Sequence, residues 1–180
     1  MDPIGVWHGE HVRFSYLLDF LERQMTAFHS GGDPNYELMR DVVHYLRHYA
    51  DRFHHAREDV AFERLLRRDP GLQATVNHLL QEHRAISVAG EALLALFEEI
   101  LDDATIARAQ VEAAAALYLV YFRNHLATEE REVLPRAAAV LTPEDWADVA
   151  AAVPDLADPV FGDDVAARYR ELRGWIAREA

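Results

Sequence analysis

Ten histidines and no cysteine determine the chemistry that this chain of 180 residues can offer. Without thiols, disulfides, iron–sulfur clusters and cysteine nucleophiles are excluded. Imidazole and carboxylate groups remain, and both are ligands for transition-metal ions. A histidine followed four residues later by a glutamate places both side chains on one face of an α-helix, as a ligand pair requires. Three such pairs occur in the sequence: His54 with Glu58, His78 with Glu82, and His125 with Glu129.

An internal repeat distinguishes two of these pairs from the third. The dipeptides Glu10-His11 and Glu82-His83 are 72 residues apart, and the pairs that begin at His54 and His125 are 71 residues apart. Each half of the chain therefore carries Glu-His on its first helix and His-x-x-x-Glu on its second. Two similar halves that meet around a pseudo-twofold axis would bring six of these side chains into one core: His11, His54, Glu58, His83, His125 and Glu129.

Helix phase tests this arrangement independently of the repeat. His11 falls on the apolar stripe of its helix, whereas His8 falls on a polar one. His83 likewise shares the apolar face of its helix and His78 does not, which marks the His78–Glu82 pair as accidental. Buried carboxylates without a partner cost several kcal/mol, so this pattern predicts a metal centre. The histidines predicted to lie at the surface are His8, His29, His44 and His78.

The second helix carries an additional histidine next to the predicted ligands. When His54 is set at zero on the helical wheel, Glu58 falls at about 40° and His55 at about 100°. The Glu58 carboxylate therefore lies between two imidazoles, which is the position of a bridging ligand. Two readings of His55 stay open: a metal ligand, or a residue beside the site or a channel. His48 and Asp51 are equally open between the surroundings of the site and the helix surface.

Helices are the elements that must position these residues. Apolar residues recur at helical spacing along nearly the whole chain, and no stretch alternates as a strand would. Breaks rich in Gly, Pro and Asp separate four long segments, roughly 7–29, 35–67, 72–101 and 103–140. We expect an all-α protein in which residues 1–141 form an antiparallel up-down four-helix bundle and residues 142–180 form a short helical C-terminal extension.

The extension carries its own helix signals. Thr142 followed by Pro143 predicts the start of a short helix near Trp146. After a break from Pro154 to Pro159, Asp163 or Asp164 is expected to cap a last helix. The apolar stripe of that helix must pack on the bundle or on a second subunit: Val165, Tyr169, Leu172 and Ile176.

The charge of the chain limits its partners. With 31 acidic and 18 basic residues the formal net charge is -13. Such a surface repels phosphate backbones and anionic lipids, so roles in binding nucleic acids or membranes are disfavoured. The N-terminus lacks the basic and apolar blocks of a signal peptide, and the longest apolar run, 113–122, is about half of what a bilayer requires. We therefore expect a cytoplasmic protein. We also expect it to be a monomer or a homodimer.

Three segments of the chain resemble the most recognisable motifs of the hemerythrin HHE cation-binding family. They agree in order, spacing and neighbouring residues, and the resemblance covers roughly residues 1–141. The segments are Phe53-His54-His55-Ala56-Arg57-Glu58-Asp59, Gln81-Glu82-His83-Arg84-Ala85-Ile86, and His125-Leu126-Ala127-Thr128-Glu129-Glu130 with Leu134-Pro135 after it.

The resemblance implies a non-haem di-iron centre, bridged by two carboxylates and an oxo or hydroxo group. Carried onto this chain, it makes Glu58 and Glu129 the bridges, with His11 and His54 on one iron and His83 and His125 on the other. One position departs from the oxygen-carrying members, which place a second histidine four residues before the third-helix histidine.

Leu79 occupies that position here. Some intracellular family members use the residue next to the second-helix histidine, and His55 is expected to supply the missing imidazole in the same way. The departure argues against oxygen carriage. The resemblance then implies a protein that handles O2, NO, peroxide or iron in stress metabolism, and it leaves open whether that is an enzymatic activity.

Two other classes compete with this reading. A ferritin-like di-iron oxidase would use Glu-x-x-His pairs and glutamates from all four helices, whereas here the order is reversed and histidines outnumber the acids. A metal-free helical interaction module is the structural alternative. Iron analysis and a visible spectrum separate the three classes.

Overall fold

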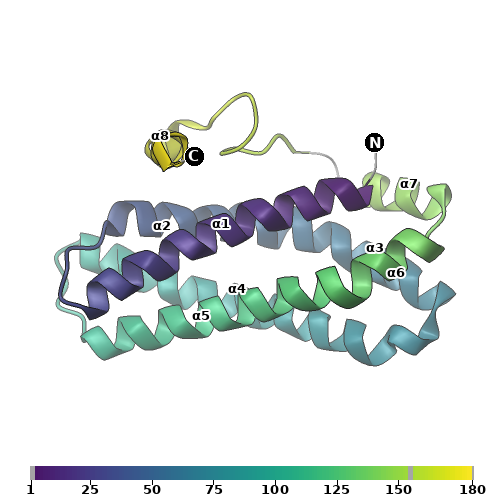
Figure 1. Cartoon of the computed structure of the whole chain (residues 1–180), viewed down its shortest axis with the longest axis horizontal. Helices are drawn as coiled ribbons and strands as arrows, with labels where there is room; N and C mark the ends of the chain where they lie inside the picture. The colour runs from purple at the N-terminus through teal and green to yellow at the C-terminus, as the bar shows by residue number, and fades with distance from the viewer. Residues whose placement is uncertain (1–2, 154–155, 180) are drawn as a thin grey trace.

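Four long helical rods lie side by side and form an antiparallel bundle (Figure 1). The computed structural model describes residues 3–153 and 156–179, and within these ranges every regular element is a helix. This confirms the all-α class and the helical bundle. In chain order the rods are α1 (Pro3–His29); α2 (Tyr36–Tyr45), a π-helical segment (Leu46–His54) and α3 (His55–Arg68); α4 (Gln73–Leu101); and α5 (Arg108–Thr128), a second π-helical segment (Glu129–Val133) and α6 (Leu134–Val140).

Local signals in the sequence set some of the helix boundaries. The side chain of Asn35 accepts a hydrogen bond from the backbone N–H of Leu38 and so caps α2. The fourth rod begins at Arg108 and not near residue 103, so the expected start is wrong. Asp103 adopts a left-handed φ of 62°, which reverses the chain after α4 and delays the next helix.

Two apolar clusters fill the bundle, one toward each end. One cluster is built around Phe14, Tyr45, Phe97 and Phe122. The other contains Trp7, Phe62, Leu65, Leu79 and Val133. The polar residues that the sequence predicts to bind metal lie between the two clusters, where Trp7 of one cluster and Phe14 of the other both contact His54.

The described residues after 141, namely 142–153 and 156–179, add two α-helices outside the four rods. In α7 (Pro143–Ala152) the side chains and backbones of Thr142 and Asp145 form a reciprocal capping box, which confirms the expected helix around Trp146. The indole of Trp146 packs edge-on against Trp7 of α1, with ring centroids 5.3 Å apart. The last helix, α8 (Arg170–Glu179), follows a 3₁₀ turn at Ala167–Tyr169.

The expected cap of the last helix is wrong. Neither Asp163 nor Asp164 caps it, because the helical turn begins three residues later, after Ala166, which has no side-chain cap. The break expected from Pro154 to Pro159 begins at residues outside the described ranges.

The apolar stripe of α8 packs on the bundle (Figure 1). Tyr169, Leu172 and Ile176 are buried in the same cluster as Phe20 of α1. The division of the chain at residue 141 stays a prediction. Among the described helices, none combines the length and the apolar character needed to span a bilayer.

Candidate metal centre

All seven residues predicted from the sequence as metal ligands meet at the middle of the bundle, and each is buried. Their ligand atoms form two groups, within each of which the atoms lie within 4.8 Å of one another. One group is His11, His54, Glu58 and Glu129, and the other is His55, Glu58, His83 and His125.

The Glu58 carboxylate belongs to both groups. Its Oε1 lies 3.0 Å from Nε2 of His54 and 3.4 Å from Nε2 of His11. Its Oε2 faces the opposite way, 3.6 Å from Nε2 of His83. One oxygen is therefore directed at each group, as a carboxylate that bridges two cations requires.

Glu129 occupies the corresponding position on the fourth rod. Its Oε2 lies 3.3 Å from Nε2 of His125 and 3.6 Å from Nε2 of His11, while Oε1 is 4.0 Å from Nε2 of His83. All four oxygens of Glu58 and Glu129 are buried, and none accepts a hydrogen bond. Buried carboxylate oxygens without donors are costly, and a cation between the two side chains removes that cost.

Four of the imidazoles are oriented by carboxylates outside the centre. Each directs Nδ1 outward to a carboxylate of a different rod, and a proton on Nδ1 leaves the Nε2 lone pair facing the centre. The Nδ1–oxygen distances are 2.7 Å for His11 with Glu130, 2.7 Å for His54 with Glu10, 2.7 Å for His83 with Asp59, and 3.4 Å for His125 with Glu82.

These four carboxylates contact the candidate ligands, and the sequence did not predict that role for them. Glu10 and Glu82 are the glutamates of the repeated Glu-His dipeptide, and Asp59 and Glu130 directly follow the bridging glutamate of each half. The repeat was therefore the signal that could have found them. Within each half, a glutamate of the first helix contacts the histidine of the second helix. Between the halves, the acidic residue of one second helix contacts the histidine of the other half's first helix.

The Nε2 atoms meet in pairs at the centre. Nε2 of His11 is 2.9 Å from Nε2 of His54, and Nε2 of His83 is 3.1 Å from Nε2 of His125. Two lone pairs at this distance repel each other unless a cation attracts both. Two nitrogens bound at right angles to a metal ion, each about 2.1 Å from it, lie about 3 Å apart. The donor set therefore fits a metal ion in each group.

The pKa shifts in the centre show that burial and mutual repulsion keep its two carboxyl groups from ionising equally readily. Burial and the charge of Glu58 raise the pKa of Glu129. Burial also opposes ionisation of Glu58, but the imidazoles of His54, His11 and His83 outweigh it and lower its pKa. A bound cation would favour the ionised form of both carboxylates.

The histidines respond to the carboxylates that face them. Burial lowers the pKa of His83, but Asp59 and Glu58 more than compensate and raise it to about 9. In His125 burial prevails over the longer bond to Glu82, and the pKa falls to about 3. The direction of the pKa shift in these two imidazoles therefore depends on how closely carboxylates face them.

His55 breaks the twofold symmetry of the centre. Its ring stacks on that of His83, with centroids 4.3 Å apart and planes 13° apart, and its buried Nε2 has no hydrogen-bond partner. The residue at the equivalent position of the second half is Leu126. Asp51, left open by the sequence, lies 3.5 Å from Nδ1 of His55 and thus beside the centre. An unpartnered imidazole nitrogen aimed at the second group is what a fifth nitrogen ligand requires.

Both π-helical segments border the centre. The first ends at His54 and the second begins at Glu129. A π-helical turn inserts one residue into the α-helical repeat and is frequent at functional sites. The hydrophobic pattern of the sequence does not predict these segments.

Most of the histidines predicted at the surface are found there. The side chains of His8 and His78 are 62% and 64% exposed. His44 is the exception and corrects the prediction: it is half-buried, because the Tyr169 hydroxyl lies 2.7 Å from its Nδ1. Its ring stacks on that of His48, with centroids 3.8 Å apart, so His48 belongs to this contact with the C-terminal segment.

The bundle and its two buried groups of histidine and glutamate define a helical protein built to bind metal ions. The family model for the hemerythrin HHE cation binding domain matches residues 2–137. The chain belongs to this family, which confirms the resemblance seen in its motifs. No curated protein and no solved structure matches the chain.

Proposed function

We propose that this protein holds two iron ions in its core and binds a small oxidant or diatomic molecule beside them. One iron is bound by His11 and His54, and the other by His55, His83 and His125, with Glu58 and Glu129 shared between them. The observation that supports this most strongly is the Glu58 carboxylate, whose two oxygens face two different groups of imidazoles.

The number of ligands supports a centre with open positions. Two six-coordinate irons need about twelve ligand atoms. The proposed set supplies five imidazole nitrogens and four carboxylate oxygens, so about three positions remain for solvent or a small ligand. Without His55 four remain, which would make the centre more open to peroxide.

Aromatic side chains surround the centre and exclude bulk water from it. Phe14 packs edge-on against His54, with ring centroids 5.0 Å apart, and Phe62 stacks on His83 at 5.9 Å. Phe122 contacts His55 at 5.8 Å. Ferrous iron with an open coordination position, when bound, would bind O2, NO or peroxide and would supply one-electron redox chemistry. The surrounding rings exclude bulk water, and the outer carboxylates hold the imidazoles in their ligand tautomer.

This arrangement favours a protein that handles oxygen species, NO or iron under stress over the two alternative classes. A ferritin-like oxidase would take most of its ligands from glutamates, whereas five histidines and two glutamates converge here. A metal-free interaction module would leave four buried carboxylate oxygens without hydrogen bonds.

Iron analysis after anaerobic reconstitution tests the proposal. The purified chain is loaded with ferrous iron, desalted and analysed for metal, and then exposed to air for a spectrum. We expect two irons per chain and near-ultraviolet absorption from a coupled ferric pair with histidine ligands. An iron content near zero contradicts the proposal, and one iron per chain contradicts the shared carboxylates.

A further inference from the structure

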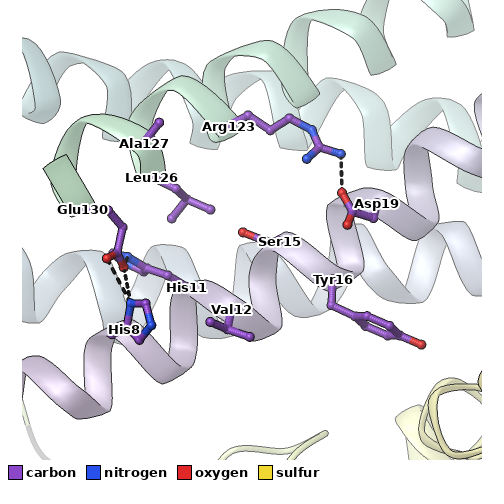
Figure 2. Close-up of a pocket in the computed structure, with 10 residues that line it drawn as sticks. All are labelled: His8, His11, Val12, Ser15, Tyr16, Asp19, Arg123, Leu126, Ala127 and Glu130. Carbon is purple, nitrogen blue, oxygen red and sulfur yellow. Dashed lines mark hydrogen bonds and ion pairs between the residues drawn. The ribbon is translucent and has the colours of Figure 1, made fainter. Parts of the chain in front are cut away.

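A surface groove of about 480 Å³ lies between α1 and α5, and His11 is among the residues that line it (Figure 2). Its lining includes Ser15 and Asp19 on α1, and Arg123 on α5. At one end it is bordered by His8, His11 and Glu130. His11 is one of the proposed iron ligands, so this groove borders the outer side of the first coordination shell.

Three side chains at this end form a graded series from solvent to the centre. The side chain of His8 is 62% exposed, that of Glu130 34%, and that of His11 3%. Both Glu130 oxygens lie close to Nδ1 of His8, at 3.1 and 3.0 Å, and Oε1 is also 2.7 Å from Nδ1 of His11. One carboxylate thus contacts an exposed imidazole and a buried one (Figure 2).

His8 and Glu130 together offer a nitrogen and an oxygen to a cation. With its proton on Nε2, His8 directs the Nδ1 lone pair at the carboxylate. A separation of 3.0 Å suits two ligands bound at right angles to one metal ion about 2.1 Å from each. The net charge of -13 raises the concentration of cations near the surface of the whole molecule.

The backbone places the inner and outer carboxylates next to each other. Glu129 and Glu130 are consecutive residues at the start of the second π-helical segment. Glu129 faces the centre with its side chain fully buried, and Glu130 faces the groove. A cation that leaves Glu130 for Glu129 is therefore transferred between the side chains of two consecutive residues.

The second half of the chain lacks this arrangement. Asp59 corresponds to Glu130 and also contacts an imidazole, that of His83, but Leu80 occupies the position that corresponds to His8. An exposed histidine does contact Glu82 there, because Nε2 of His78 lies 3.1 Å from its Oε1. Glu82 is buried, however, with its side chain 7% exposed, and it does not line the groove.

We propose that His8 and Glu130 form a transient capture site for divalent cations, through which ferrous iron reaches the buried centre along the groove. This inference rests on the proposed function, since it requires that the centre takes up iron. It adds a third, outer cation site that is not part of the final pair.

The rate of anaerobic ferrous iron uptake tests the capture site. Metal-free protein is mixed with ferrous iron, uptake is stopped at set times with an excess of a coloured ferrous chelator, and protein-bound iron is measured after desalting. His8→Ala should slow uptake about tenfold, because local capture of the ion is lost. The final content should stay at two irons per chain, because His8 is not a ligand of the pair.

His78→Ala is the matched control. This substitution also removes an exposed histidine from a carboxylate that orients a proposed ligand, but this carboxylate, Glu82, does not line the groove. The variant should therefore take up iron at the parent rate. Uptake by His8→Ala at the parent rate would overturn the capture site while leaving the proposed function intact. Equal slowing by both variants would overturn it as well, because the effect would then belong to the outer carboxylates in general. A parent protein that takes up no iron would overturn the proposed function itself.

Discussion

Nε2 of His11 lies 2.9 Å from Nε2 of His54, although each ring already directs its Nδ1 at a carboxylate 2.7 Å away. With both protons on Nδ1, no proton remains to join the two inner nitrogens. The same relationship recurs between His83 and His125 at 3.1 Å. The fold therefore places two pairs of imidazole nitrogens face to face at the centre, and a cation between the nitrogens of each pair stabilises them.

The first prediction concerns the shared carboxylates. Glu58→Ala should release both irons together, because it removes a ligand from each. Glu129→Ala should have the same effect. Both are checked by iron analysis and by the loss of the near-ultraviolet bands. His78→Ala should keep two irons, and a loss as severe as that of His83→Ala would show that the proposed ligand set on α4 is wrong.

The second prediction concerns His55, the residue without a counterpart in the second half. His55→Leu should weaken one iron selectively, because the other keeps His11, His54 and both carboxylates. It should also open one more coordination position and change the azide spectrum of the ferric protein. A variant with two tightly held irons and an unchanged azide spectrum would refute the five-imidazole centre and leave a four-imidazole centre standing.

The third prediction compares two carboxylates that orient imidazoles. Loss of such a partner usually reduces metal affinity about 10- to 100-fold. Glu10→Ala should fall in this range, because Glu10 binds His54 at 2.7 Å and the charges of His54 and Arg57 lower its pKa to about 2 despite burial. Glu82→Ala should cost less, because its bond to His125 is 3.4 Å long. Competition with a ferrous chelator measures both, and the reverse order would contradict the account.

The fourth prediction concerns pH and the packing of the C-terminal helix. Burial and the positive charge of Arg168 lower the pKa of His44 to about 4, and nearby His48 adds to the effect. An unfolded histidine has a pKa of about 6.5, so the unfolded state binds the proton more readily. The stability that neutral His44 contributes is therefore present above about pH 6.5 and is lost as the pH falls toward about 4.

The fluorescence of Trp175, isolated by replacing Trp7 and Trp146 with phenylalanine in every protein compared, reports the packing of α8, because its ring packs on Phe20 of α1 with centroids 4.2 Å apart. Thermal unfolding followed at Trp175 should show a falling midpoint between pH 6.5 and pH 4 in the parent. His44→Gln, which takes up no proton, should reduce that fall. An identical pH dependence in the parent and in the variant would show that His44 does not control the packing of α8.

Residue spacing and helix phase were sufficient to predict much of the centre. The repeat of Glu-His and His-x-x-x-Glu identified the residues that converge, and the apolar stripes separated His11 from His8 and His83 from His78. These inferences succeed because helix geometry converts spacing directly into direction. Whether the converging residues bind iron stays a proposal.

Other features depend on contacts between segments that are distant in sequence. The surface position predicted for His44 is wrong because Tyr169 of the C-terminal segment covers it. An aspartate is a suitable N-cap in sequence terms, but the helical turn begins after Ala166, which forms no side-chain cap, so the cap predicted at Asp163 or Asp164 is wrong. The π-helical segments leave no mark on the hydrophobic period, so phase could not reveal them.

The most direct test of the central claim is the anomalous diffraction of iron-loaded crystals, collected at the iron edge. We predict two peaks per chain, about 3.5–4 Å apart as in other two-metal sites. One should lie between His11 and His54 and the other among His55, His83 and His125, with one oxygen of Glu58 bound to each. A single peak, or peaks confined to surface histidines such as His78, would contradict the claim that Glu58 joins two metal ions in the core.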